Sequence, residues 1–417
     1  MKGLAAIVCI SILAFSAGAA AQKKSSTDYM DEANKALNAG KWGEAMGAFN
    51  KVLSKDKGDE KAMWGKGLVH IRKGDYKSAK GYCKGFIGKQ KKSPYAHTCL
   101  GYAQLVWKRS SLAIESFEDA LALDPDFSLA IAGVGHAYVL QGKKKPAEEK
   151  FKEALQKNGE DIEALVGLAD LLVIVERGGE AVELLKPVKD KFSEDPRFLF
   201  QLGKALGSGD EAEKLLSKAV SLRSGWAVGH QMLAQILFNN GKYDACINSA
   251  KEATGLESDL VDALKYEGLC LYKQDKYDEA IAMLKKVMEK VPNMADAQQY
   301  IGLAYDAMNE YVKAEEAYKS AMNMDTKYGD PVVSLGHLYY RTGKPTSAMS
   351  ILEKAIGIDS DSSLAYQITA DIFYERSSWK NAKTNYRKAL DGDMKNVDKS
   401  YIEGRIKEAE EHLSKKP

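Results

Sequence analysis

Small residues recur along this chain at a fixed step of 34 residues, and no other feature limits its fold as strongly. Aligned on Gly302, they form a first register: Ala33, Gly67, Gly101, Gly135, Ala169, Gly203, Ala234, Gly268, Gly302, Gly336 and Ala370. The step is 34 everywhere except between Gly203 and Ala234, where it is 31. Eleven units therefore share one pattern.

A second register follows the first by twelve residues in most units. It consists of Ala45, Ala79, Ala113, Ala147, Ala181, Ala212, Cys246, Ala280, Ala314, Ala348 and Ala382. Two helices per unit, each of about 14 residues at 3.6 residues per turn, would cross where these side chains let the backbones approach. A glycine, a polar residue and an aromatic residue often lie between the registers, as in Gly40-Lys41-Trp42, and glycine there ends the first helix.

The array resembles the tetratricopeptide repeat family, whose helix–turn–helix unit is 34 residues long. Units one to five would occupy residues 26–195, and units six to eleven residues 196–396. The resemblance implies an all-α fold, an α-solenoid superhelix of about eleven units that are stabilised by stacking on one another. Residues 397–417 place Tyr401, Ile402 and Ile406 among many charges, which predicts a C-terminal capping helix.

The array is irregular between its fifth and sixth units. Pro187 lies inside the expected second helix of unit five, where it removes a backbone hydrogen bond and bends the helix. Unit six has lost three residues and contains Gly207 and Gly209, which predicts a short first helix. We therefore expect two sub-solenoids that join near residues 187–210.

The first residues have the pattern of a secretory signal peptide. Lys2 precedes an apolar run from Leu4 to Ala17 and small residues up to Ala21, so we expect residues 1–21 to be removed and residues 22–25 to form a short linker. The alternative is an uncleaved anchor, because about 18 apolar residues can just span a bilayer. No Asn-x-Ser/Thr sequon occurs, which favours export to the periplasm of a Gram-negative bacterium.

The resemblance also implies a concave groove, lined by the second, fifth, ninth and twelfth positions of the first helices. In units two to four these positions hold Trp64, Leu68, Ile71, Tyr95, Tyr102, Leu105, Leu129, His136 and Val139. We call these nine residues the apolar strip. Such a strip predicts a docking site for a protein segment, with aromatic anchors; the alternative is that neighbouring side chains or the superhelical twist cover it.

Units seven to eleven differ at the same positions. There the groove holds Gln231, Gln235, Asp262, Lys265, Asp296, Gln299, Asp330, Gln367 and Asp371. We expect this part of the groove to be polar and mildly acidic.

The four cysteines after the leader fall into two pairs. Cys83 belongs to the second helix of unit two and Cys99 to the first helix of unit three, and Cys246 and Cys270 have the same relation in units seven and eight. Those helices should pack together, so each pair could form a disulfide in an oxidising compartment if its Cα atoms lie within about 7 Å. The alternative is four buried free thiols.

Several function classes receive no support. The full chain has a net charge of only +2 and its basic runs are short, so we expect no nucleic-acid partner. The six histidines are scattered, without the three- or four-residue spacing of a metal site on a helix, so no metal is expected. No nucleophile elbow, phosphate loop or HExxH run occurs, which leaves no catalytic residue and no cofactor to name.

The leader and the repeats together predict a non-enzymatic protein–protein interaction scaffold in the cell envelope. Its partners would be other proteins, chiefly envelope proteins, with no membrane span after signal cleavage. The alternative is an accessory subunit or carrier that binds a glycan or lipid. Aromatic residues can stack on sugars, but a carbohydrate site also needs clustered polar groups beside them, and units two to four offer few.

Overall fold

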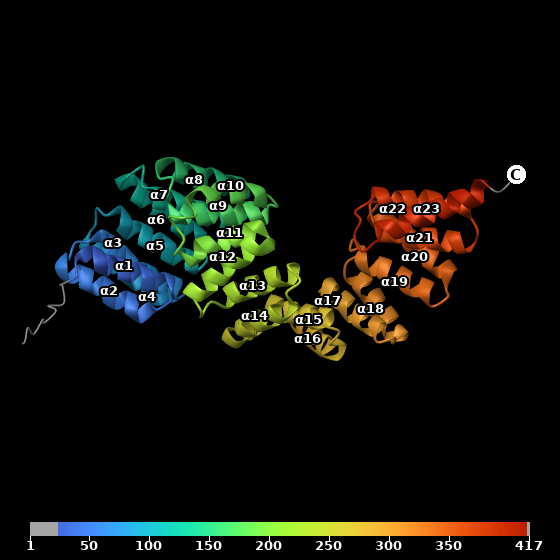
Figure 1. Cartoon of the computed structure of the whole chain (residues 1–417). Helices are drawn as coiled ribbons and strands as arrows, with labels where there is room; N and C mark the ends of the chain where they lie inside the picture. The colour runs from blue at the N-terminus through green and yellow to red at the C-terminus, as the bar shows by residue number, and fades with distance from the viewer. Residues whose placement is uncertain (1–23, 415–417) are drawn as a thin grey trace, which may run out of the picture. The chain divides into compact units, whose positions relative to one another are not determined.

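The computed structural model describes residues 24–414, and over this range the chain forms only helices, with no strand (Figure 1). The predicted leader, residues 1–21, lies outside the described residues, as do the last three residues. Eleven consecutive helix pairs and one final helix follow one another, so the predicted all-α solenoid is confirmed.

The chain divides into two compact units between Leu168 and Ala169, a boundary that falls inside helix α9. The first unit contains α1 (Ser26–Asn38), α2 (Trp42–Lys55), α3 (Glu60–Arg72), α4 (Tyr76–Lys89), α5 (Pro94–Val106), α6 (Ser110–Leu123), α7 (Ser128–Leu140), α8 (Lys144–Lys157) and the start of α9 (Ile162–Ile174).

The second unit continues from the end of α9. It contains α10 (Gly178–Leu185), α11 (Pro196–Leu206), α12 (Gly209–Leu222), α13 (Ala227–Asn239), α14 (Tyr243–Leu256), α15 (Val261–Lys273), α16 (Tyr277–Lys290), α17 (Ala295–Ala307), α18 (Tyr311–Met324), α19 (Asp330–Arg341), α20 (Pro345–Ile358), α21 (Ser363–Glu375), α22 (Trp379–Asp391) and α23 (Lys399–Ser414). Odd-numbered helices up to α21 are thus the first helices of repeats one to eleven, and the even-numbered helices that follow them are the second helices.

Local sequence signals set where the helices begin and end. Ser25 and Asp28 form a capping box before α1, and the Asp59 carboxylate accepts the backbone N–H of Ala62 before α3. After α3, Gly74 takes the left-handed conformation, with φ of 76°, and the chain turns into α4. The turn signals of the sequence therefore match the helix ends that they predict.

The two registers of small residues lie where the helices of a repeat cross. Every member of the second register is fully buried, with 0% of its surface exposed. In the first register, a Cβ atom added to Gly302 would lie 2.7 Å from two ring carbons of Tyr318, and one added to Gly101 would lie 2.4 Å from the Phe117 ring. Glycine at these positions lets a large side chain of the second helix fill the space against the first.

The irregular region has the local form that the sequence predicts. Helix α10 ends at Leu185 and a short 3-10 helix, Lys186–Val188, contains Pro187. Helix α11 has 11 residues and stops at Gly207, which is left-handed. This stretch lies within the second unit, and a flexible joint at residues 187–210 stays a prediction.

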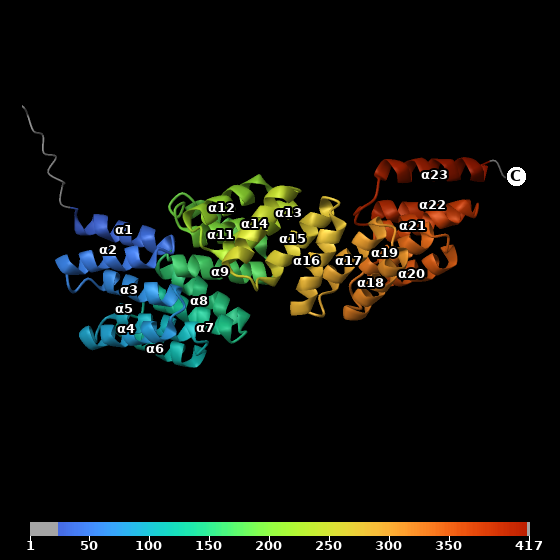
Figure 2. The same ribbon diagram turned by 90° about the horizontal axis from the view of Figure 1, so that it is seen from below.

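The predicted capping helix is α23, which lies beside α22 (Figure 2). Its Ile402 and Ala409 are fully buried, and Ile406 packs against the same cluster as Tyr386 of α22. The hydroxyl of Tyr401 donates to the Asp371 carboxylate of α21 at 2.9 Å. Helix α23 thus covers apolar surface that repeat eleven would otherwise expose.

Candidate functional site

The apolar strip of repeats two to four forms a continuous line, but most of it is packed against the protein itself. Trp64 and Tyr102 are only 9% and 8% exposed, and the other seven residues are half-buried. The Trp64 and Tyr102 rings lie 5.5 Å apart between centroids, and the His136 ring is 6.0 Å from that of Tyr102. The Tyr102 hydroxyl donates to the carbonyl oxygen of Leu129 at 3.3 Å. The structure therefore brings the predicted residues together, with Trp64 and Tyr102 in the core and the other seven side chains half-buried.

Contacts across the groove explain this burial. A guanidinium nitrogen of Arg72, at the end of α3, lies 3.6 Å from a carboxylate oxygen of Glu163, in the first turn of α9, and both side chains are only 14% exposed. Arg72 also donates to the side-chain oxygen of Asn38 at 3.0 Å, and the His136 ring lies 3.2 Å from the carbonyl oxygen of Glu163. Repeats two and five thus meet beside the strip, and its two largest rings, Trp64 and Tyr102, are closed to a partner. A binding role for it stays a prediction.

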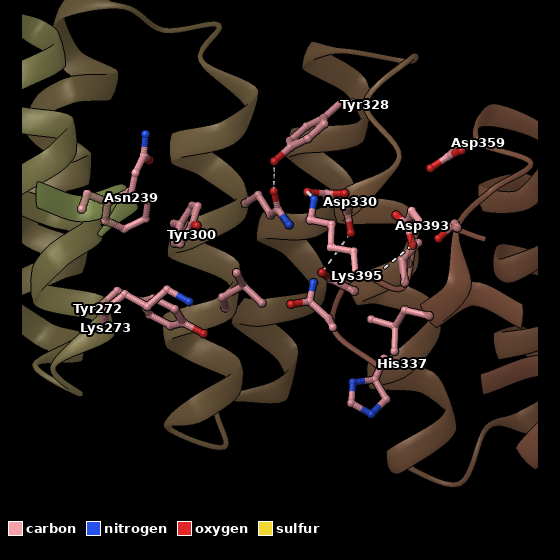
Figure 3. A pocket seen from close by; sticks show the side chains of 18 of the residues that line it. Asn239, Tyr272, Lys273, Tyr300, Tyr328, Asp330, His337, Asp359, Asp393 and Lys395 are labelled. Atoms are coloured by element: carbon pink, nitrogen blue, oxygen red, sulfur yellow. Dashed lines mark hydrogen bonds and ion pairs between the residues drawn. The ribbon is translucent and has the colours of Figure 1, made fainter. Parts of the chain in front are cut away.

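The second unit contains an open cavity of about 1000 Å³ on the side formed by the first helices (Figure 3). Five tyrosines line it: Tyr243, Tyr272, Tyr300, Tyr318 and Tyr328. We call it the tyrosine cavity. Its walls come chiefly from the first helices α13, α15, α17, α19 and α21. The end of α11, Tyr243 of α14, Tyr318 of α18 and the segment that joins α22 to α23 complete them. A concave surface that combines aromatic and polar groups is the usual form of a binding site.

Ring packing and hydrogen bonds fix the tyrosines in place. The Tyr272 and Tyr300 rings meet edge to face at 5.4 Å. The Tyr318 hydroxyl donates to the Asp306 carboxylate at 3.4 Å, and the Tyr328 hydroxyl donates to the side-chain oxygen of Gln299. The cavity therefore presents ordered ring faces beside polar groups.

Carboxylates set the electrostatics of the tyrosine cavity. Asp306, Asp330, Asp359 and Asp393 line it, against the two cations Lys273 and Lys395. Burial raises the pKa of Tyr300 to about 12, and Asp330 and Asp296 add to that rise. Burial also raises the pKa of Tyr328, again with Asp330 and Asp296 contributing. The phenols stay protonated at neutral pH and can donate hydrogen bonds in a negative field.

His337 is the one histidine among the residues that line the tyrosine cavity. Burial lowers its pKa, and the nearby Arg341 guanidinium adds to that effect, while Asp306 and Asp371 oppose it. The imidazole is therefore neutral at physiological pH and can act as either a donor or an acceptor.

The polar groove predicted for units seven to eleven is only partly the tyrosine cavity. Gln299 and Asp330 line the cavity, whereas the Lys265 ammonium pairs with Asp296 at 3.2 Å and with Asp262 at 3.6 Å. Asp371 is buried under the capping helix. The expectation of a polar, mildly acidic surface thus describes the cavity, but most of the residues named for it pair among themselves or lie elsewhere.

Sequence reasoning missed several residues that line the tyrosine cavity. Phe238, Tyr272 and Asp306 occupy the twelfth position of consecutive repeats, so the groove rule applied to every residue type could have found them. Asp393 and Lys395 lie after α22, at the end of repeat eleven and outside its helices. No periodic signal could have placed them in the groove.

Comparisons with protein families identify the repeats. Models described as tetratricopeptide repeat match residues 30–97, 271–327 and 332–362. A model described as anaphase-promoting complex, cyclosome, subunit 3 matches residues 207–287. Tetratricopeptide repeats are therefore matched in two parts of the chain, residues 30–97 and 271–362.

Solved structures share this fold at low sequence identity. The human IFIT1 dimer with m7Gppp-AAAA is 17% identical to this protein, with 78% of this chain and 83% of that chain covered and a TM-score of 0.52. Yeast Tom70 is 16% identical, with coverage of 93% and 96% and a TM-score of 0.48. No curated protein matches the sequence. At these identities the likeness concerns the fold alone.

Both cysteine pairs of the repeat protein form disulfides in the structure. Cys83 of α4 is bonded to Cys99 of α5, with 5.4 Å between the Cα atoms, and Cys246 of α14 to Cys270 of α15, with 6.6 Å. Both separations suit a disulfide. Gly67 packs against the first bridge, since a Cβ atom there would lie 2.5 Å from the Cys99 sulfur. Each bridge links the second helix of one repeat to the first helix of the next.

The next two observations concern metal-binding groups and membrane-spanning helices within residues 24–414. No group of three or more His, Cys, Asp or Glu side chains in this range is placed to hold a metal ion. Within the same residues, no helix is both long enough and apolar enough to cross a membrane.

Proposed function

We propose that this chain is a non-enzymatic scaffold that holds a segment of a partner protein in the tyrosine cavity. The observation that carries the proposal is the cavity itself, an open concavity of about 1000 Å³ on the first-helix side of the second unit. First helices of stacked repeats present successive side chains along one surface, which suits an extended or helical peptide.

The tyrosine cavity is preferred over the apolar strip because it offers exposed charged groups. Trp64 and Tyr102, two of the expected anchors, already have their partners within repeats two to four. In the cavity, by contrast, Asp330 keeps 44% of its side-chain surface exposed and Lys395 keeps 58%. Groups that are still hydrated are the ones that a partner can engage.

The proposed setting is the cell envelope, with an envelope protein as the partner. This part rests on the signal-like residues 1–21 and on two disulfides, which persist in oxidising compartments such as the bacterial periplasm. Separation of periplasm, cytoplasm and membranes tests it, since a chain recovered from the cytoplasm with Met1 intact would refute export.

Photocrosslinking in the producing cells tests the docking site. A crosslinking residue would replace Ser334 in the tyrosine cavity, Leu68 in the apolar strip, or Lys354 on the exposed side of α20. We expect one protein to be trapped from Ser334 and not from Lys354. Trapping from Leu68 alone would return the site to the strip, and equal trapping from all three positions, or from none, would refute both.

A second candidate function is glycan binding, which one observation favours. The tyrosine cavity places Asn239, Asn396 and Ser334 beside its tyrosine rings, and this is the combination of polar and aromatic groups that a carbohydrate site needs. Calorimetric titration with envelope polysaccharide fragments would detect such binding. If Tyr272→Ala and Tyr300→Ala left it unchanged, the cavity would not be the glycan site.

A further inference from the structure

A lysine of the chain itself occupies the tyrosine cavity. The Lys395 ammonium lies 3.0 Å from a carboxylate oxygen of Asp330, at the start of α19 (Figure 3). Lys395 belongs to the segment between α22 and α23, so the ion pair joins residues that are 65 positions apart. This contact shows that the Asp330 carboxylate pairs with a cation in the folded protein.

The backbone around Lys395 is held firmly. The N–H of Asp393 donates to the carbonyl oxygen of Asp361 at 2.8 Å, and its carboxylate accepts the N–H of Ser363 at 3.1 Å. The N–H of Met394 donates to the Ser363 hydroxyl at 2.8 Å. A Cβ atom on Gly392 would lie 2.3 Å from the Asp361 carbonyl oxygen, so only glycine fits there. The backbone is anchored, and the lysine side chain is the part that can move.

The ion pair itself is weak. Both side chains are about half exposed, and an ion pair in contact with water contributes little to stability. A cation brought by a partner can therefore replace Lys395 at little cost. The released ammonium returns to water, which solvates it well.

The surroundings of Asp330 favour a cation over an anion. Asp359 and Asp393 add negative charge to the cavity. The charge of Asp306 is neutralised, because its carboxylate pairs with the Arg341 guanidinium. The rings of Tyr300 and Tyr328 lie near Asp330, and aromatic faces attract Lys and Arg side chains. An acidic segment would meet repulsion here, and a neutral one would leave the carboxylates without new partners.

We infer that the tyrosine cavity binds an extended polypeptide segment with basic side chains, and that Lys395 pairs with Asp330 until a basic side chain of the partner replaces it. The inference rests on the proposed function and adds to it the chemical class of the partner segment. Lys395 then competes with the partner for Asp330, so Lys395 opposes binding of the segment and Asp330 favours it.

The test uses the full chain and a short fluorescein-labelled peptide of alternating lysine and threonine. Fluorescence anisotropy would measure its dissociation constant, beside matched peptides in which glutamate or glutamine replaces lysine. We expect the lysine peptide to bind most tightly. Lys395→Ala should tighten that binding by about two- to fivefold and Asp330→Asn should weaken it by a similar factor, the range that exposed ion pairs span.

Matched controls lie side by side on α20, outside the cavity lining. Lys354→Ala and Glu353→Gln make the same charge changes on exposed residues, and we expect neither to alter the dissociation constant. A folding defect would weaken binding in both cavity variants, so tighter binding by Lys395→Ala cannot come from damage. Rising salt should reduce the difference between the lysine and glutamate peptides.

Three results would overturn the inference: equal or tighter binding of the glutamate or glutamine peptide, no difference between Lys395→Ala and Lys354→Ala, or saturation of the cavity by a glycan with no binding of the lysine peptide. The proposed function can survive such a failure. If crosslinking from Ser334 traps a protein segment without basic residues, the scaffold role stands and only the charge class is wrong.

Discussion

The sharpest structural prediction concerns Gly302, where the two helices of repeat nine cross. A Cβ atom at this position would lie 2.7 Å from two ring carbons of Tyr318 and 3.3 Å from the Cβ of Ala317. Tyr318 is fully buried and its hydroxyl donates to Asp306, and both features hold the ring in this position. Gly302→Ala should therefore force α17 and α18 apart.

Two opposing effects set the magnitude. Alanine is a better helix former than glycine by about 1 kcal/mol, which favours the variant. One extra methyl group in a packed core costs about 1 to 3 kcal/mol, since normal carbon–carbon contacts are about 3.5 to 4.0 Å. The net expectation is a loss of about 0 to 2 kcal/mol in the stability of repeat nine.

Gly404 provides the matched control. It lies within α23, and an added Cβ atom there would have no other atom within 4 Å. Gly404→Ala keeps only the gain in helix propensity and should stabilise α23 by up to about 1 kcal/mol. The same substitution of glycine by alanine is thus expected to lower stability at Gly302 and to raise it at Gly404.

Hydrogen exchange read out by mass spectrometry is the suitable assay. Repeat arrays do not unfold in one cooperative step, so a global melting temperature would blur a local effect. Amides of α17 and α18 should exchange faster in Gly302→Ala, and amides of α23 more slowly in Gly404→Ala. If Gly302→Ala protected α17 and α18 as well as the native chain does, close helix crossing would not be the reason for glycine there.

Three further predictions concern the cysteines and two titrating groups. Peptide mapping of the unreduced protein should find both cysteine pairs joined, and alkylation of those four thiols without a reductant would contradict the bridges. Burial keeps the pKa of His337 below its ordinary 6.5, so near that pH the unfolded chain binds a proton that the folded chain does not. The free energy of unfolding should therefore fall as the pH drops below 6.5. In urea titrations, His337→Gln should weaken this pH dependence. Burial raises the pKa of Glu267 above 4.5, so the contribution of its protonated carboxyl to stability is present in acid and is lost as the pH rises through the folded-state pKa. The stability of Glu267→Gln should depend less on pH over that range. An unchanged dependence of stability on pH would argue against a buried carboxylate there.

The sequence by itself determined the repeat architecture. Gly302 and Ala314 are small because two helices cross there, and this requirement returns in every repeat at the same two positions. Helix ends are local as well, since Ser25 and Gly74 act through the backbone of their own turn. Such features depend on residues close in sequence, so periodicity could reveal them. The relation of neighbouring helices likewise indicated Cys83 and Cys99 as a possible pair, and the structure decided between a disulfide and free thiols.

Only the tertiary structure decided which surfaces stay open. The sequence placed Trp64 and Tyr102 in the groove, but it did not show that both rings are buried there or that Arg72 pairs with Glu163. It also gave no sign that Lys395 reaches Asp330. The first pair joins repeats two and five, and the second joins the start of α19 to the segment after α22. Neither contact lies within the two helices of one repeat, so the repeat pattern does not predict it. A rule that treats each repeat alike assigns positions to a groove, but exposure within it is set by contacts between residues far apart in the sequence.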